Sequence, residues 1–270
     1  MIAKPGLPPR PGCLYDFATM GPLAVIRYLH RALKARRRNE RAEIAALRRL
    51  VRPGSVALDI GAHKGSYLFW LRRAVGPSGK VLAFEPQPLL AAYLQDLTRT
   101  FRWRNVEVRH QGISDSPGEL ILHVPGAAGV ISPGASFEAS VTDHGPSHSV
   151  RVKVTSLDFE FPAGSPGPSF IKCDVEGHEL AVFEGGASLL ATQGPALLFE
   201  CEARHLGGRP VSDVFAILVK LGYAGEFFSL DGLRPVSEFR PDIHQSEDGD
   251  RFWDRHDYCN NFLFTKPKRN

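Results

Sequence analysis

The stretch VALDIGAHKG (56–65) decides the fold expected of this chain, because an apolar run passes directly into a glycine turn. Val56–Ile60 is typical of a short buried strand, and residues 66–75 continue with a helical pattern. Gly61 and Gly65 allow a tight turn and a close approach of a ligand to the backbone. The free N–H groups of the following helix face the same place. The sequence therefore predicts a ligand at this turn, although a plain strand-to-helix connection has the same appearance.

Two acidic residues near the turn favour a nucleoside cofactor that carries a positive charge. Asp59 stands two residues before Gly61, and His63 occupies a position where the dinucleotide pattern GxGxxG has glycine. Glu85 follows the next apolar run, at the distance where an acidic side chain accepts both hydroxyls of a ribose. The simpler interpretation of Glu85 is a charge at a helix N-terminus, since Pro86 suits a first turn.

The rest of the chain continues an alternation of strands and helices, which is typical of a parallel α/β sheet. Ligands of such sheets lie at the carboxyl ends of the strands. Long segments rich in turn residues at 125–149 and 230–256 are expected to be loops that shape a pocket. Further strands are predicted at 80–84, 106–109, 120–124, 150–157, 170–173, 196–200, 223–228 and 258–264, and helices at 23–50, 88–100, 178–191 and 211–221.

Charged residues follow two of the apolar strands and are the candidate catalytic groups. Asp174, Glu176 and His178 come directly after the strand at 170–173, where unpaired charges cost desolvation. His205 follows the next strand and titrates near neutral pH. Each of the four could act as a base, although solvated loop charges would have the same pattern. A divalent cation is conceivable on Asp174, Glu176, Glu200 and His205, but their spacing does not demand one, so no metal is predicted.

Composition excludes several classes of protein. The 270 residues include 33 Lys+Arg against 29 Asp+Glu and are 43% hydrophobic, which argues against disorder, a fibrous repeat or a membrane bundle. No run approaches the ~18 apolar residues of a membrane helix, and the first residues do not resemble a signal peptide. The four cysteines are far apart and form no CxxC pair, which favours a reduced, cytoplasmic protein without structural zinc.

Positive charge is concentrated near the N-terminus. Residues 27–52 hold ten Lys/Arg and two Glu, so the remainder of the chain is net negative. Nucleic acid or anionic lipid could bind such a segment. Apolar residues at helical spacing instead favour the solvated face of a helix, and this is the prediction made here. We expect an N-terminal arm with helices over 1–52 and one domain over 53–270. The sequence does not indicate an oligomeric state.

The motifs at the strand ends resemble the FkbM family of S-adenosylmethionine-dependent methyltransferases. The resemblance rests on LDIGAHKG (58–65), VLAFEPQP (81–88), TSLD (155–158), FIKCDVEGHEL (170–180), VFEGGASLL (182–190) and ALLFE (196–200). It implies a class I methyltransferase fold, in which a Rossmann-like sheet of seven strands ends in an antiparallel strand and carries helices on both faces. It also implies S-adenosylmethionine as methyl donor and a hydroxyl acceptor of the sugar or secondary-metabolite type.

The resemblance also assigns roles to residues. Asp59, Gly61, His63 and Gly65 would hold the methionine end, although the family commonly has Asn at position 63. Glu85 and Pro86 would contact the ribose, and Asp174 would lie beside the sulfonium with Glu176 nearby. Gln111, Gly112 and Ile113 would line the adenine. The alternatives are an RNA or other nucleic-acid methyltransferase that uses the basic helices, and a cofactor-binding module without catalysis.

Overall fold

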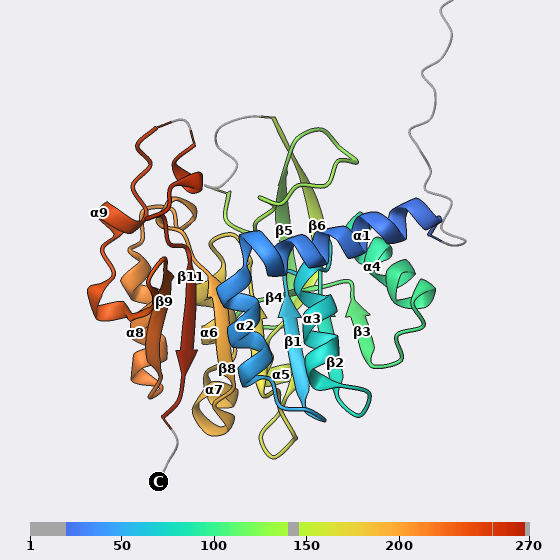
Figure 1. Ribbon diagram of the computed structural model, residues 1–270, viewed down its shortest axis with the longest axis horizontal. Coiled ribbons are helices and arrows are strands. Elements are labelled where there is room, and N and C mark those ends of the chain that lie inside the picture. The colour runs from blue at the N-terminus through green and yellow to red at the C-terminus, as the bar shows by residue number, and fades with distance from the viewer. Residues whose placement is uncertain (1–19, 140–145, 250, 268–270) are drawn as a thin grey trace, which may run out of the picture.

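An eight-stranded, mostly parallel sheet forms the centre of the protein (Figure 1). The computed structural model describes residues 20–139, 146–249 and 251–267, so residues 1–19 of the expected N-terminal arm lie outside them. The strand order is β10-β9-β11-β8-β7-β1-β2-β3. The bounds are β1 (Val56–Ile60), β2 (Lys80–Phe84), β3 (Val106–Arg109), β7 (Phe170–Cys173), β8 (Ala196–Glu200), β9 (Ala224–Ser229), β10 (Gly232–Pro235) and β11 (Asn261–Thr265).

The direction of the strands confirms the expected sheet. β1, β2, β3, β7 and β8 pair in parallel, whereas β11 is antiparallel to both β8 and β9. Seven strands therefore follow the expected pattern with the last one reversed. The eighth, β10, forms a hairpin with β9 at the edge of the sheet. It lies inside the expected loop 230–256, which also contains α9 (Pro241–His244).

Helices cover both faces of the sheet, which explains why its central strands are apolar on both sides. The first face packs against α1 (Pro22–Lys34), a π-helical segment (Ala35–Asn39), α2 (Arg41–Leu50), α3 (Ser66–Val75) and α4 (Pro88–Thr100). Buried side chains of α1 and α2, among them Tyr28, Ile44 and Leu47, share a core with β1 and β2. The N-terminal helices are therefore part of the same packed unit.

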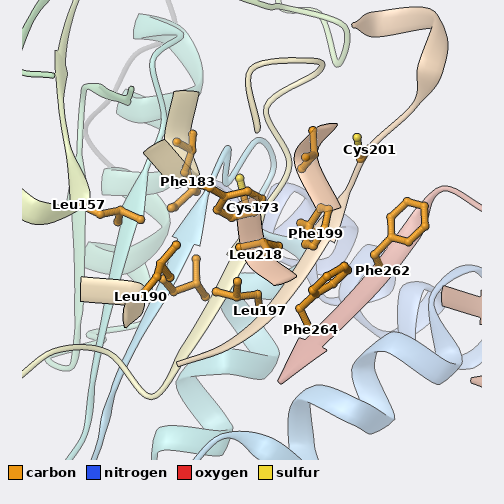
Figure 2. Close-up of a cluster of buried hydrophobic side chains, with 14 of the residues drawn as sticks. Leu157, Cys173, Phe183, Leu190, Leu197, Phe199, Cys201, Leu218, Phe262 and Phe264 are labelled. Atoms are coloured by element: carbon orange, nitrogen blue, oxygen red, sulfur yellow. The ribbon is translucent and has the colours of Figure 1, made fainter. Parts of the chain in front are cut away.

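The second face packs against α5 (Leu157–Glu160), α6 (Glu179–Glu184), α7 (Ala187–Gln193) and α8 (Val211–Lys220). Figure 2 shows the centre of this core, where Phe199 lies among Phe183, Phe262 and Phe264. Short 3-10 turns also lie at Ala203–His205, Val236–Glu238 and Phe252–Asp254.

The expected helix at 178–191 is wrong in one respect, because α6 and α7 are separate helices. They part at Gly185 and Gly186. A Cβ atom on Gly185 would lie 2.2 Å from the Ser114 carbonyl oxygen, and one on Gly186 would lie 2.7 Å from Cδ1 of Leu157. Because glycine has no side chain, the segments around Ser114 and Leu157 can pack directly against the backbone at this break.

A separate three-stranded sheet lies beyond the carboxyl end of β3, in the order β4-β6-β5. It consists of β4 (Gly112–Ile113), β5 (Gly118–Pro125) and β6 (Ser147–Thr155). β5 and β6 are antiparallel, and β4 pairs in parallel with β6. The segment between them turns back on β5 through an isolated bridge between His123 and Ser136.

Two further findings bear on the expectations from composition. Among the described residues, no helix is both long enough and apolar enough to cross a membrane. Cys173, Cys201 and Cys259 are buried free thiols, and burial raises their pKa. Cys13 lies outside the described residues.

Candidate active site

The turn between β1 and α3 depends on two glycines. Gly61 has φ +73°, and a Cβ atom there would lie 1.8 Å from the Asp174 carbonyl oxygen. Gly65 has φ +75° and immediately precedes α3, and its Cβ would lie 2.9 Å from a methyl group of Leu94. Gly61 thus serves the close packing of β1 against the end of β7, in addition to any ligand.

Glu85 lies at the carboxyl end of β2 with only 2% of its surface exposed. Its two carboxylate oxygens accept hydrogen bonds from the backbone N–H groups of His63 (2.7 Å) and Gln87 (2.8 Å). Burial nevertheless raises its pKa to about 7. Each carboxylate oxygen has a second lone pair, so the group retains acceptor capacity for ribose hydroxyls.

Asp59 is buried on β1, and its Oδ2 has no hydrogen-bond partner among the described residues. Burial raises its pKa to about 7, although the nearby Lys172 acts in the opposite direction. Nε2 of His63 is also buried without a described partner, and burial lowers the pKa of this imidazole to about 4. Orphaned buried polar atoms are costly, so both positions fit a ligand that supplies a donor or a cation.

Lys172 is the important residue that the sequence prediction missed. It pairs in register with Asp59 on the neighbouring strand and is 2% exposed. Its Nζ lies 3.5 Å from Oδ2 of Asp174, and 5.0 Å from the ring centre of Tyr67 on α3. Burial acts to lower its pKa, but the carboxylates of Asp174 and Glu200 outweigh that effect and raise it. A buried ammonium ion therefore stands among the carboxylates of the site.

Asp174 and the pair formed by Glu176 and His205 lie together beyond β7 and β8. The Asp174 carboxylate is about one-third exposed, whereas both members of the pair are largely buried. Nδ1 of His205 lies 2.9 Å from Oε2 of Glu176, and burial raises the pKa of this carboxyl group. The Glu176 backbone has φ +53°, and its carbonyl oxygen accepts a hydrogen bond from Ser136. The structure therefore brings three of the four predicted catalytic residues to one place.

His178 has a different environment from the other candidates. Its Nδ1 lies 2.9 Å from Oε1 of Glu138, and its Nε2 lies 2.9 Å from the Ser114 hydroxyl. The ring is buried, and both nitrogens already have partners. This arrangement is typical of a side chain that holds loops together. Glu138, which sequence analysis did not single out, also pairs with Arg209.

A cleft at the carboxyl edge of the sheet is lined by Glu85, Asp174 and Glu176, whereas Asp59, Lys172, His178 and His205 are not among its lining residues. Side chains from the segment between β5 and β6 form its opposite wall. Gln111, Gly112 and Ile113 do not line it: the latter two form β4, and their adenine contact stays a prediction. The lining residues are Gly61, His63, Glu85, Pro86, Gln87, Leu122, Pro133, Ala135, Ser136, Phe137, Asp174, Val175 and Glu176.

Asp174, Glu176, Glu200 and His205 were the candidate ligands for a divalent cation. Within the part of the chain that the structure describes, no group of three or more His, Cys, Asp or Glu side chains is placed to hold a metal ion.

Comparison with known proteins identifies the family. Residues 59–224 match the model of the methyltransferase FkbM domain, which is more than half of the chain. The chain belongs to the FkbM methyltransferase family. The resemblance noted from the strand-end motifs is thereby confirmed. This FkbM protein matches no curated protein at a significant level.

Solved structures of methyltransferases are among those that the chain is similar to. The protein is similar to methyltransferase FkbM from Methylobacillus flagellatus KT, with 16% identity over 91% of this chain and 56% of that chain, and a TM-score of 0.48. It spans little more than half of that chain's length. It is also similar to a SAM-dependent methyltransferase from Aquifex aeolicus, with 16% identity over 82% of this chain and 87% of the other, and a TM-score of 0.43.

Family membership implies S-adenosylmethionine as the cofactor, and residues that line the cleft or adjoin its glycine turn fit it. Asp59 offers an unpartnered carboxylate oxygen, which suits a positively charged ligand. Glu85 offers a fixed pair of acceptors on the adjacent strand. The glycine turn between them presents backbone at close range.

Proposed function

We propose that this FkbM protein transfers a methyl group from S-adenosylmethionine to a hydroxyl group of a sugar or secondary-metabolite type small molecule in the cytoplasm. One observation carries the proposal: two buried carboxylates, Asp59 and Glu85, stand at the ends of adjacent strands beside a glycine turn, and Gly61, Glu85 and Asp174 line the same cleft. Two acidic groups on adjacent strands suit opposite halves of a cationic nucleoside better than they suit packing.

The cofactor-binding roles follow from these positions. Asp59 and the turn at 61–65 hold the methionine end, with His63 directed by its bonded backbone N–H. Glu85 and Pro86 hold the ribose. Gln111, Gly112 and Ile113 are assigned to the adenine on the family resemblance alone.

The residues around Asp174 supply the remaining chemistry. The bound cofactor supplies an activated methyl group, so the protein has to orient the acceptor and remove its proton. Asp174 is suited to both tasks, because its carboxylate is partly exposed within the cleft. Its oxygen would accept the hydroxyl proton while the acceptor oxygen displaces sulfur from the methyl carbon, and the electron pair of the broken C–S bond would leave with S-adenosylhomocysteine. The ammonium group of Lys172, 3.5 Å from Oδ2 of Asp174, holds this carboxylate in its orientation.

Glu176 and His205 form the rival base. A carboxylate that holds one nitrogen of an imidazole leaves the other nitrogen to accept a proton, which is a common arrangement in general-base catalysis. His178 is the weaker rival, because both of its nitrogens are engaged.

The acceptor pocket includes the wall contributed by β5 and by the segment between β5 and β6. Leu122, Ser136 and Phe137 face the cleft from this side. An apolar wall with a few polar groups suits a small organic acceptor, since pockets for such ligands are mostly apolar.

The test compares Asp174→Asn with His205→Gln. Formation of S-adenosylhomocysteine is measured with a panel of sugar and polyketide hydroxyl acceptors and with total RNA, and cofactor affinity is measured by calorimetry. We expect Asp174→Asn to lower kcat by about a hundredfold or more while cofactor affinity stays within a few-fold. Near-normal turnover in Asp174→Asn together with loss in His205→Gln would transfer the role of base to the histidine. Methylation of RNA alone would refute the small-molecule assignment.

A further inference from the structure

The outer surface of α2 and the π-helical segment before it has a groove of arginines that the methyl-transfer site does not use. We call this set the arginine groove. None of its four guanidinium groups has a carboxylate partner among the residues that the structure describes, and Arg36 lies 4.9 Å from the ring centre of Trp70. The groove is lined by Arg36, Arg37, Arg41 and Arg48, together with Ile44 and Ala45.

The acidic residues of the same segment do not neutralise the groove. Glu40 and Glu43 are the only carboxylates between positions 27 and 52. Glu43 is 9% exposed, and Oε2 of Glu40 is buried, so burial raises the pKa of this carboxyl group although Lys172 acts in the opposite direction. Both acids are therefore withdrawn beneath the helices, and the outer face carries unbalanced positive charge.

Apolar side chains interrupt the charge on the exposed face of α1. Leu23, Ile26 and Leu33 are 59%, 61% and 39% exposed and fall on one side of the helix. We call them the apolar stripe. Arg27 and Lys34 are exposed beside them. A helix that only faces water gains nothing from exposing three large aliphatic side chains among its cations.

We propose that the arginine groove and the apolar stripe form a docking surface for a membrane that contains anionic phospholipid. Guanidinium groups match phosphate with paired hydrogen bonds, so the groove binds headgroups. The aliphatic side chains enter the boundary between headgroups and acyl chains, as in interfacial amphipathic helices. A nucleic acid would account for the arginines but would leave the apolar stripe in water, and for this reason the lipid surface is the occupant that fits both observations.

Docking has a defined orientation relative to the site. α1 crosses the carboxyl edge of the sheet, where β1 ends (Figure 1). The Tyr28 hydroxyl donates to the Gly65 carbonyl oxygen at 3.1 Å, and Arg31 donates to the carbonyl oxygen of Lys64 at 3.2 Å. The helix that meets the lipid is thus directly bonded to the turn that meets the cofactor.

The test is sedimentation of the full chain with vesicles of phosphatidylcholine alone and of phosphatidylcholine mixed with phosphatidylglycerol. We expect binding only to the mixed vesicles, and weaker binding at high salt. The double variant Arg37→Gln/Arg41→Gln should bind roughly thirtyfold more weakly, which corresponds to ~1 kcal/mol for each membrane-facing arginine. Ile26→Ser/Leu33→Ser should also weaken binding, although it changes no charge.

A matched control removes the same charge from the other edge of the sheet. Arg104 and Lys220 are exposed and precede the starts of β3 and β9. Arg104→Gln/Lys220→Gln should therefore bind vesicles as the original chain does. Circular dichroism checks that each variant is folded. Equal loss in the control, or vesicle binding that Ile26→Ser/Leu33→Ser leaves unchanged, would overturn the proposal. So would binding of a single-stranded RNA probe without any binding to mixed vesicles.

Discussion

Replacement of Asp59 by Asn should have opposite effects on stability and on cofactor binding. Burial raises the pKa of Asp59 from its ordinary 3.8 to about 7. The folded protein therefore holds this proton more tightly than the unfolded chain does, and stability is lost as the pH rises from about 4 to about 7. At about 1.4 kcal/mol per pH unit, the full cost at pH 8 is about 4 kcal/mol. The amide of Asn leaves a buried donor unsatisfied at a cost of about 1–3 kcal/mol, so a net gain of about 1–3 kcal/mol remains.

Urea denaturation of the cofactor-free protein at pH 5 and pH 8 measures this gain. Asp59→Asn should be more stable than the original chain at pH 8 and should lose much of that advantage at pH 5. Calorimetry at pH 8 should show weaker binding of S-adenosylmethionine, because the variant lacks the carboxylate that a cationic ligand needs. The exposed Asp231 provides the control, since Asp231→Asn should change neither quantity.

Two results would refute this reasoning. A variant that is less stable than the original chain at pH 8 would show that Asp59 is already stabilised by the protein alone, without a ligand. An unchanged affinity for S-adenosylmethionine would show that the carboxylate serves the fold and does not contact the cofactor.

Two other substitutions test the packing behind the site. Gly61→Ala should destabilise the protein by about 3 kcal/mol or more, because the new methyl group meets the carbonyl oxygen of Asp174 at a positive φ. Thermal denaturation measures the loss, and Gly76→Ala, which also has a positive φ but open space around the new methyl group, should cost less, about 1–3 kcal/mol from backbone strain alone. Lys172→Met should lower the urea unfolding free energy by about 3 kcal/mol at pH 8, since it leaves buried carboxylates without their cation. The exposed Lys220→Met should be neutral, and an equally mild effect at both lysines would contradict the assigned role of Lys172.

The central strands were predictable because their sequences have no competing interpretation. The apolar runs at Val56–Ile60 and Phe170–Cys173 have the same bounds in the structure as in the prediction. Glycine and acidic residues directly after such strands then located the candidate site, since the topology brings strand ends together. The edge strand β10 could not be found in the same way, because Gly232–Pro235 is short, largely exposed and contains proline.

Contacts between distant segments account for most of what sequence reasoning missed. Lys172 lies within an apolar strand, and nothing local indicates that it faces Tyr67 and Asp174. Glu138 lies in a segment without periodicity, and its structural role depends on its contact with His178 on a distant segment. Periodicity describes a residue's own strand or helix, whereas these side chains are defined by partners from other elements.

The bonds between α1 and the glycine turn give the N-terminal helix a thermodynamic role. Any ligand that tightens the turn also changes the free energy of detaching α1, because the Tyr28 hydroxyl and the Gly65 carbonyl are shared between the two. Such coupling is reciprocal. A surface that holds α1 in place would therefore change the affinity of the turn for its ligand by the same factor as the ligand changes attachment to that surface.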